Sequence, residues 1–306
     1  MKILITGGAG FIGSNLADKF IERGDKVFII DNLLTGRLDN VNDKAIFFKE
    51  TIANQKEFRS FFIEAEPDVV IHAAASYKEP DLWEFDVQNN ILGTINVIRN
   101  CEEFKVKRLI YFETSLCYGN SPIEQPITLT HPINPTNTSY AITKTAAELF
   151  IFSSNLNYVT FRLANCYGPR NTAGAVPSFY IRLKQDIPCF AYDTRRDFIF
   201  IDDLMNVVIK AADGIGKGTY HISTGKDYAI KEVYDIVAKC LGINKEAELK
   251  PILPDDVFSI LLDPSKTIDT FKVEPKTPLE EGIEKAVKWY ESVNLSEFFT
   301  HLRISK

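Results

Sequence analysis

Three side chains that could together move a proton occur close to one another in the chain: Thr114, Tyr140 and Lys144. Tyr140 and Lys144 stand four positions apart in SYAITK (139–144), so they share one face of the helix that we expect there. A free phenol is a poor base at neutral pH because its pKa is about 10, but a neighbouring ammonium stabilises the phenolate and lowers that pKa. The hydroxyl of Thr114 could hold a substrate alcohol and the oxyanion that develops on it. Together these groups suit the removal of a proton from an alcohol whose carbon gives up a hydride.

The stretch FETSLCYGN (112–120) indicates which further chemistry these residues can support. Thr114 and Ser115 form a hydroxyl pair, and Leu116 occupies the next position, where an acid could have stood. Leucine can neither protonate a leaving hydroxyl group nor accept a proton from a neighbouring carbon. The stretch therefore offers no carboxyl group directly after the hydroxyl pair.

A glycine-rich turn, TGGAGFIGS (6–14), follows the first apolar run of the chain. It fits G-x-G-x-x-G through Gly8, Gly10 and Gly13, and it also fits G-x-x-G-x-x-G through Gly7, Gly10 and Gly13. Glycines permit a tight turn and the close approach of a pyrophosphate, and the N-terminus of the following helix supplies free N–H donors. The turn predicts a dinucleotide site, although a plain tight turn is the simpler alternative.

An aspartate at the end of the next apolar run supports the prediction of a dinucleotide site. The run KVFII (26–30) is followed directly by Asp31. A carboxylate at this place can accept hydrogen bonds from both ribose hydroxyls of an adenosine and would repel a 2′-phosphate, which favours NAD over NADP. Arg37 keeps NADP open, because an arginine can accommodate that phosphate.

Short apolar runs alternate with segments of helical period through the first part of the chain. We expect strands at 2–6, 26–30, 45–48, 68–72, 108–113 and 158–163, and helices near 13–23, 55–64, 86–104 and 139–155. This alternation predicts an α/β fold with a doubly wound parallel sheet (Rossmann) of about seven strands. The strand ends then meet at one edge of the sheet, where ligands bind. The Tyr-x-x-x-Lys pair follows the fifth strand, which distinguishes it from an ordinary solvated helix face.

After residue 164 the pattern loosens into a smaller α+β C-terminal lobe. Loop-like stretches at 168–179 and 251–256 alternate with expected helices near 202–213, 230–241 and 278–292. We expect a dinucleotide-binding domain at 1–164, to which 194–225 returns, and a substrate lobe made of 165–193 and 226–306. The cleft between them would hold a second ligand.

Composition excludes several functional classes. A net charge of −6 and a pI near 5.4 argue against a nucleic-acid or membrane-surface binder. No apolar run is long enough for a membrane-spanning helix. The cysteines are odd in number and form no CxxC pair, so we expect reduced thiols in a cytoplasmic protein and no metal site.

Read in order, these motifs resemble the extended short-chain dehydrogenase/reductase family, specifically its NAD-dependent sugar-nucleotide epimerases and dehydratases. The resemblance runs from end to end through TGGAGFIGS, DNLLTG (31–36), DVVIHAAA (68–75), NNILGTINV (89–97), ETSLCYG, SYAITK, RLANCYGPR (162–170), RRDFIFIDDL (195–204) and YHISTG (220–225). Its dehydratases carry a carboxylate pair, or at least a glutamate, just after the catalytic threonine; this chain has Ser115 and Leu116 there.

The resemblance implies roles for individual residues. The set Thr114, Tyr140 and Lys144 would be catalytic, and the substrate would be contacted by Thr114, Ser115, Asn165 and Arg196. NAD would be bound by Gly7, Gly10, Phe11, Ile12, Gly13, Asp31, Asn32, Ala73, Ala74, Ala75, Asn90, Tyr140 and Lys144. Asn165 could instead cap a turn, and Arg196 could form an interdomain salt bridge with Asp202 or Asp203. His72 ends a buried strand and is expected to be a core histidine.

The implied activity is that of an NAD-dependent nucleotide-sugar 4-epimerase working through a 4-keto intermediate. The substrate would be a UDP-hexose or UDP-N-acetylhexosamine for surface polysaccharide. A reductase or dehydratase of the same family, and a non-catalytic NAD-binding regulator, are the alternatives. The resemblance also implies a homodimer formed through helices 86–104 and 139–155, in which Ile91, Ile95 and Ile98 could face the partner or the core.

Overall fold

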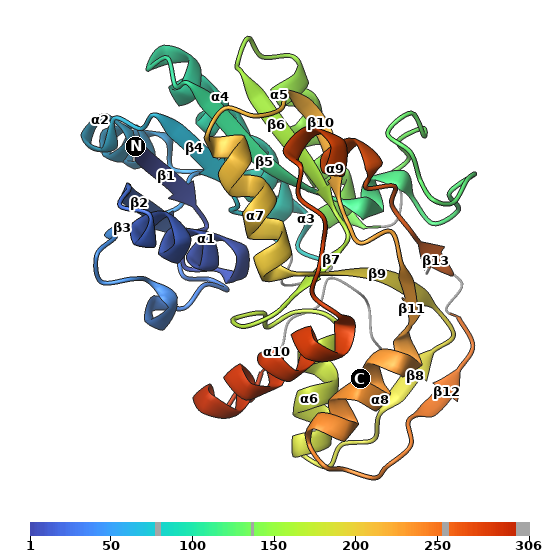
Figure 1. Cartoon of the computed structure of the whole chain (residues 1–306). Coiled ribbons are helices and arrows are strands. Elements are labelled where there is room, and N and C mark those ends of the chain that lie inside the picture. Colours follow the sequence, from blue (N-terminus) through green and yellow to red (C-terminus); the bar gives the residue numbers. More distant parts are fainter. Residues whose placement is uncertain (77–80, 136–137, 253–256, 298–306) are drawn as a thin grey trace.

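A seven-stranded parallel sheet forms the centre of the protein (Figure 1). The structure is a computed structural model that describes residues 1–76, 81–135, 138–252 and 257–297. The strand order is β10-β6-β5-β4-β1-β2-β3. Their bounds are β1 Lys2–Thr6, β2 Lys26–Asp31, β3 Ile46–Lys49, β4 Val69–His72, β5 Arg108–Thr114, β6 Tyr158–Leu163 and β10 Gly218–Ile222. The expected doubly wound α/β fold is confirmed.

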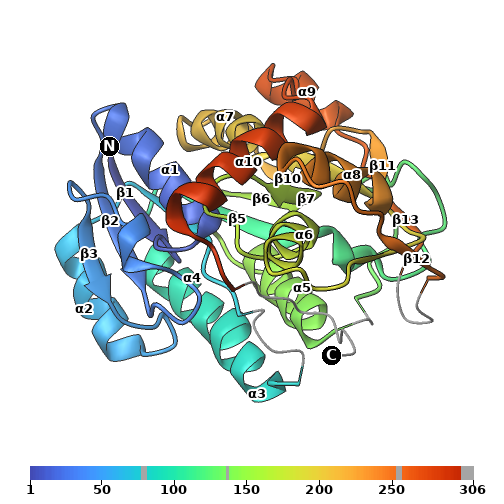
Figure 2. The same ribbon diagram turned by 90° about the horizontal axis from the view of Figure 1, so that it is seen from below.

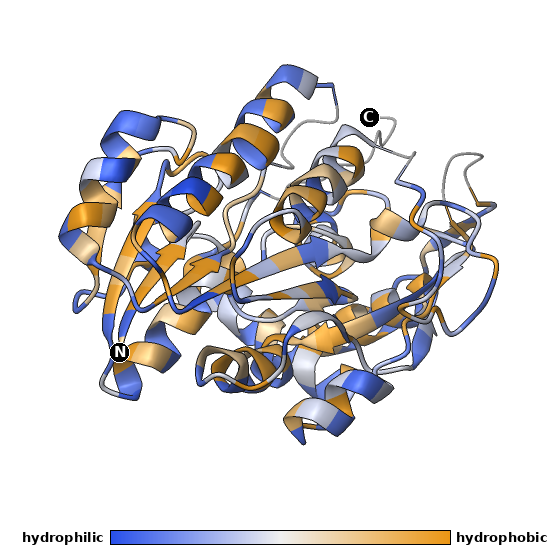
Figure 3. Ribbon diagram, turned by 90° about the horizontal axis from the view of Figure 1, so that it is seen from above, coloured by the Kyte–Doolittle hydropathy of each residue, from blue (hydrophilic) through white to orange (hydrophobic). Residues whose placement is uncertain are grey.

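Consecutive strand residues point to opposite sides of the sheet, and both sets are apolar here. Both faces of the sheet are therefore apolar. Ile3 and Ile5 of β1 belong to one buried cluster, whereas Leu4 between them belongs to another. Figure 3 shows apolar colours along the strands of the sheet. The strands therefore need a layer of helices on each face.

Helices cover both faces of the sheet (Figure 2). One face is covered by α1 (Phe11–Glu22) and α7 (Ile201–Ala212), which pack against each other. The other face is covered by α2 (Gln55–Ala65), α4 (Gly93–Glu103) and α5 (Ser139–Phe152). Among the described residues, no helix has the length and apolar character that crossing a membrane requires.

The helix expected at 86–104 is interrupted. The chain forms α3 (Trp83–Asp86), then a π-helical turn, η2 (Val87–Leu92), and then α4. Such wide turns often occur at functional sites. The first residue of α4 is Gly93, where an added Cβ would lie 2.7 Å from Cδ1 of Ile52, so the helix runs close to the loop after β3.

A second lobe lies below the sheet in Figure 1 and contains two small sheets. The four-stranded sheet consists of β7 (Asn165–Tyr167), β9 (Arg195–Phe200), β11 (Asp227–Ala229) and β13 (Ser259–Ile260), and the two-stranded sheet of β8 (Phe190–Tyr192) and β12 (Glu248–Lys250). The remaining helices are α6 (Ala175–Lys184), α8 (Ile230–Cys240), α9 (Ser265–Phe271) and α10 (Leu279–Val293), with short 3₁₀ turns η1 (Leu38–Asn40) and η3 (Ser115–Tyr118).

The prediction of a loop throughout 168–179 is wrong, because α6 begins at Ala175. Gly174 precedes the helix with a φ of +90°, which glycine tolerates. Pro177 lies in the first turn of α6, where the missing N–H of proline costs no helical hydrogen bond. A proline that looked like a loop signal therefore stands at a helix start.

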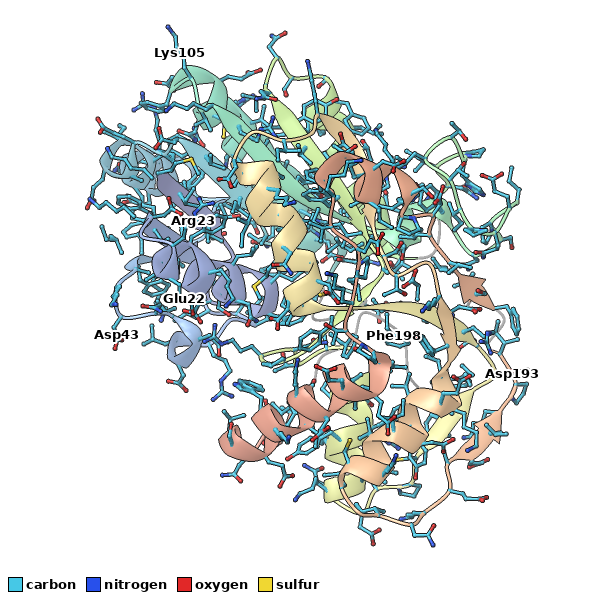
Figure 4. All side chains as sticks on the ribbon, in the orientation of Figure 1. Glu22, Arg23, Asp43, Lys105, Asp193 and Phe198 are labelled. Carbon is cyan, nitrogen blue, oxygen red and sulfur yellow. The ribbon has the colours of Figure 1, made fainter. Side chains whose placement is uncertain are left out.

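Segment 194–225 contributes to both parts of the molecule. Its first strand, β9, pairs with β7, β11 and β13, whereas α7 packs on the large sheet and β10 pairs in parallel with β6. Phe198 of β9, labelled in Figure 4, packs its ring against Tyr167 of β7 with the centroids 6.0 Å apart. We retain the division into two domains as a proposal.

Candidate active site

Two hollows meet at the carboxyl ends of the large sheet's strands. The first hollow has a volume of about 300 Å³ and the second about 290 Å³. Thr114 and Asn165 line both of them, so the hollows adjoin at the end of β5. This is the edge where ligands collect in parallel α/β sheets.

Most of the expected site residues lie around these hollows. The first is lined by Gly7, Gly10, Phe11, Ile12, Gly13, Asp31, Asn32, Ala73, Ala74, Ala75, Thr114, Tyr140, Lys144 and Asn165. The second is lined by Thr114, Ser115, Asn165 and Arg196 among others. Of the expected residues, Asn90 lines neither hollow. The fold thus brings together side chains from strands and loops that are far apart in sequence.

The glycine-rich turn joins β1 to α1 beside the first hollow. Gly7 has a φ of +69°, and an added Cβ there would lie 2.6 Å from the backbone nitrogen of Ala74. An added Cβ at Gly13 would collide with the carbonyl oxygen of Gly7. Gly8 instead packs against the side chain of Ile29, so the pattern through Gly7, Gly10 and Gly13 is the one that faces the hollow. The turn forms a close-fitting cradle at a helix N-terminus, which suits a pyrophosphate.

Asp31 ends β2 and is almost fully buried at the rim of the first hollow. Its Oδ2 accepts a hydrogen bond from the backbone N–H of Ala9 at 3.0 Å, and its Oδ1 accepts one from Leu33 at 2.8 Å. Burial raises the pKa of Asp31, and these backbone donors oppose the rise. The carboxylate is therefore fixed in position where the ribose of a dinucleotide would lie.

Asn90 differs from its expected place at the cofactor. It is buried within η2, where its Oδ1 accepts from the N–H of Ser76 at 2.7 Å. Its Nδ2 donates to the carbonyl of Ser76 at 3.2 Å and to Oγ1 of Thr143 at 3.0 Å. Because its amide makes these bonds, Asn90 connects the loop after β4 to α5 without lining the first hollow.

His72 is a core histidine, as expected. Its ring nitrogens lie 2.7 Å from Oγ1 of Thr6 and 2.8 Å from Oγ1 of Thr94, and the side chain is fully buried. Burial, with a contribution from the nearby charge of Lys144, lowers the pKa of His72 well below its usual value. The residue is a neutral structural link between β4 and its neighbours.

The hydroxyl pair lies where β5 ends and η3 begins. Oγ1 of Thr114 accepts a hydrogen bond from the backbone N–H of Leu116 at 3.2 Å and so caps the turn. A hydroxyl group retains its own proton as a donor when it accepts such a bond. Ser115 is buried and lines the second hollow together with Leu116.

Tyr140 and Lys144 both line the first hollow from α5. The helix is capped by Thr138, whose Oγ1 accepts from the N–H of Ala141 at 3.1 Å. Nζ of Lys144 lies 3.9 Å from the ring centroid of Tyr111, and only 3% of the side chain is exposed. Burial lowers the pKa of Lys144 to about 8, and the carboxyl groups of Glu113 and Glu148 oppose this fall.

Sequence reasoning missed a group of buried charges beneath α5. Glu113 of β5, Glu148 of α5 and Arg162 of β6 are all nearly inaccessible to solvent. Arg162 donates from Nη2 to Oε2 of Glu148 at 2.8 Å. Charged residues within the apolar runs RLIYFE and YVTFRL could have indicated this buried group.

Two expected substrate contacts lie on the strands of the second lobe. Nδ2 of Asn165 donates to the carbonyl of Asp197 at 3.3 Å. Nη1 of Arg196 donates to the carbonyls of Val257 at 2.9 Å and Phe258 at 3.4 Å, which holds its side chain at the wall of the second hollow. Asp203 accepts from the backbone N–H groups of Lys276 and Thr277, so it anchors the segment that leads to α10.

Several known proteins are similar to this chain over nearly its whole length. The chain is 45% identical to Bordetella bronchiseptica WbmH, solved in complex with NAD+, with a TM-score of 0.93 over 96% of this chain and 99% of that one. It is 37% identical to WbmG of the same organism, solved with NAD and UDP, with a TM-score of 0.91 over 100% and 99% of the two chains. A UDP-glucose 4-epimerase of Mycolicibacterium smegmatis is 28% identical over 311 residues, which cover 95% of this chain and 98% of that protein.

The family model of the NAD dependent epimerase/dehydratase family matches residues 3–223, well over half of the chain. The match spans the glycine-rich turn, the end of β5 and the Tyr140–Lys144 pair. The resemblance inferred from the sequence is therefore confirmed. This chain belongs to the NAD-dependent epimerase/dehydratase family, and NAD is its cofactor.

Proposed function

We propose that the protein is an NAD-dependent nucleotide-sugar 4-epimerase. The observation that carries this proposal is that Tyr140 and Lys144 line the first hollow together with Thr114, which also lines the second. Ser115 and Leu116 line the second hollow. The first hollow suits the dinucleotide because of its glycine cradle and Asp31. The second is then left for the sugar nucleotide.

Bound NAD would supply the acceptor and donor of the hydride. Tyr140 takes the proton of the sugar's 4-hydroxyl group as the carbon is oxidised and returns a proton when the ketone is reduced. The ammonium of Lys144 stabilises the phenolate of Tyr140 in both steps. The hydroxyl of Thr114 donates to the sugar oxygen and stabilises the charge that develops there. Rotation of the 4-keto sugar between the two steps inverts the carbon.

Leu116 supports epimerisation over elimination, because it places a hydrocarbon beside the substrate. Glu113 is the acid that precedes Thr114; its carboxyl accepts a hydrogen bond from Thr145 at 3.1 Å and lies 3.5 Å from the hydroxyl of Tyr111. Glu113 lines the first hollow but not the second, so its carboxyl is not placed at the proposed sugar site. A dehydratase or decarboxylase would need an acid or base at the sugar itself.

The second hollow suits a nucleoside diphosphate carrying a sugar. Arg182 and Arg196 line it and offer positive charge for a diphosphate, while Phe190 and Tyr192 offer aromatic surface for a base. WbmG, which is similar over the whole chain, was solved with UDP. We infer a UDP-hexose or UDP-N-acetylhexosamine as substrate.

Product analysis by NMR tests this proposal. The purified protein is incubated with UDP-, GDP-, CDP- and dTDP-sugars without added cofactor. We expect interconversion of 4-epimers of a UDP-sugar. A 4-keto-6-deoxy product would show a dehydratase, stoichiometric consumption of NADH would show a reductase, and bound NAD without any conversion would favour a regulator.

Replacement of Asp31 by Asn is expected to weaken NAD binding by about 10- to 100-fold, since a hydrogen bond to a charged group contributes about 1.5–3 kcal/mol. The ratio of NAD to NADP affinity should also fall, because the carboxylate that repels a 2′-phosphate is lost. Calorimetric titration of the cofactor-free protein with each cofactor measures both effects. Asp43→Asn, at an exposed aspartate labelled in Figure 4, is the control. Equal binding by both variants would refute the role of Asp31.

A homodimer is the proposed assembly. Ile98 packs into the core, so it is not available to a partner. Apolar side chains are nevertheless exposed on the adjoining helices α3, η2 and α5 (Figure 2): Trp83, Val87, Ile142, Leu149 and Phe150. Exposed apolar side chains on helices that contact one another suit the same surface of a second copy. Cytoplasmic location, supported by five free thiols, and a role in surface polysaccharide remain proposals.

Leu149→Glu is expected to convert the dimer to a monomer, because a carboxylate would be buried without a partner at the interface. Light scattering should give about twice the chain mass of 34.6 kDa for the wild type and the single mass for this variant. Ile63→Glu, at an exposed position on α2, is the matched control and should leave the dimer intact. A monomeric wild-type protein would contradict the proposed assembly.

A further inference from the structure

A buried set of ionisable groups lies directly beneath the proposed catalytic helix, and the mechanism above does not use all of it. Glu113 is 2% exposed, Glu148 is fully buried and Arg162 is 4% exposed. Lys144 and Glu148 stand one helical turn apart on the buried face of α5. Burying so many charges is costly unless each has a compensating partner.

Two of these charges compensate each other. Nε and Nη2 of Arg162 donate to Oε2 of Glu148 at 3.2 and 2.8 Å, and Oγ1 of Thr160 donates to Oε1 at 2.8 Å. Glu148 and Arg162 thus form a closed, hydrogen-bonded pair between α5 and β6. Glu113 and Lys144 remain to be accounted for.

The other groups facing Lys144 are neutral. Burial lowers the pKa of His72 on β4 well below its usual value, so its ring carries no charge. Burial raises the pKa of Tyr111 on β5 well above its usual value, so the phenol keeps its proton. Glu148 is already paired with Arg162, and Tyr140 is the group on which Lys144 acts. Glu113 is therefore the group whose negative charge can compensate the ammonium of Lys144.

Tyr111 lies between the carboxyl and the ammonium. Its ring centroid is 3.9 Å from Nζ of Lys144, and its hydroxyl donates to the carbonyl of Lys144 at 3.0 Å and lies 3.5 Å from Oε2 of Glu113. Thr145, the residue after the lysine, donates to Oε1 of Glu113 at 3.1 Å. The carboxyl of Glu113 is thus linked to α5 directly through Thr145. It also lies close to Tyr111, whose hydroxyl is bonded to the backbone of Lys144.

Burial shifts the pKa values of the two groups toward one another. Burial raises the pKa of Glu113 to about 8, although Lys144 opposes this rise. Burial lowers the pKa of Lys144 to about 8, although Glu113 opposes this fall. Since each group favours the charged form of the other, ionisation of the carboxyl raises the affinity of the amine for its proton.

We propose that Glu113 is a positioning residue that maintains the charge of Lys144: as the pH rises, its carboxyl gives up a proton and the resulting carboxylate keeps the ammonium protonated beside Tyr140. The proposal rests on the proposed role of Tyr140 and Lys144. Glu113 also lines the first hollow, but the role assigned to its carboxyl is electrostatic and acts through Lys144. It explains why an acid occupies a buried strand position next to Thr114.

The test compares Glu113→Gln with Glu113→Asp. Glutamine keeps the size and one hydrogen-bond acceptor but removes the charge, whereas aspartate keeps the charge and shortens the side chain. Tyrosinate absorbance of the NAD-loaded protein is titrated against pH, and the same titration with Tyr140→Phe added is subtracted. In Glu113→Gln the lysine loses its proton earlier, so the ionisation midpoint of Tyr140 should rise by about one pH unit or more. Glu113→Asp should stay closer to the wild type.

A merely structural role for Glu113 predicts a different outcome: an unchanged midpoint in Glu113→Gln, or a larger disturbance in Glu113→Asp than in Glu113→Gln. Either result would overturn the proposal. The titration needs no sugar, so it gives its answer even if product analysis finds no epimerisation. Failure of the proposed function is thereby distinguished from failure of this inference.

Infrared spectroscopy gives a second, independent measurement should Glu113→Gln not fold. In the wild type the carboxylic acid band of Glu113 should disappear as the pH rises through about 8. In Lys144→Met the compensating charge is absent, so the band should persist to a higher pH. An unchanged transition in Lys144→Met would show that the two groups are not coupled.

Discussion

Replacement of Tyr140 by Phe is expected to lower kcat by about 100- to 10,000-fold, the usual contribution of a general acid–base group. Tyr140 lines the first hollow next to Lys144 and Thr114, and the change removes only its hydroxyl group. KM should change little, because the ring of Tyr140 and the whole lining of the second hollow remain. Initial rates of epimer formation, measured over a range of UDP-sugar concentrations, separate the two parameters.

Two controls make this result specific. Tyr158→Phe makes the same chemical change on β6, at a residue that lines neither hollow, and should keep wild-type turnover. The NAD content of purified Tyr140→Phe should equal that of the wild type, which excludes loss of cofactor as the cause. Retention of more than about a tenth of the wild-type kcat would show that another group acts as the base.

The dinucleotide half of the site could be predicted from the sequence because its signals are local. The glycines of 7–13 follow β1 directly, and Asp31 follows the residues that form β2. The position of each motif in a strand-turn-helix unit follows from the residues next to it. Parallel strands then bring their carboxyl ends to one edge of the sheet. The arrangement of Tyr140 and Lys144 likewise follows from helical spacing alone.

Features that depend on contacts distant in sequence could not be predicted. Asn90 is the residue type that the resemblance implies for a cofactor ligand. Its amide is instead hydrogen-bonded to Ser76 and to Thr143, which lies 53 positions away in the sequence. The partnership of Glu113 with Lys144 exists only because β5 and α5 pack together. The start of α6 at Ala175 could not be predicted from Gly174 and Pro177, because glycine and proline also occur in loops. For Asn90 and Glu113 the deciding contacts lie on elements that are distant in sequence.

Replacement of Arg162 by Met is expected to destabilise the fold by about 3–5 kcal/mol, because it leaves a buried carboxylate without its cation. Glu148 is fully buried, and Arg162 contacts it at 2.8 Å while also donating to the hydroxyl of Tyr118 at 2.8 Å. Thermal unfolding should show a melting temperature lower by several degrees. Arg59→Met, which breaks the exposed pair of Arg59 with Glu103, should cost less than about 1 kcal/mol.

The double variant Arg162→Met/Glu148→Leu separates stability from the alignment of the catalytic helix. Replacing both members of a buried ion pair by apolar groups is often neutral, so most of the lost melting temperature should return. Turnover should not return to the same degree, because Glu148 lies one turn beyond Lys144 and its hydrogen bonds fix the position of α5 on β6. A double variant as unstable as Arg162→Met would mean that the unpaired carboxylate is not the cause of the loss. Full recovery of turnover together with stability would mean that the pair does not position Tyr140 and Lys144.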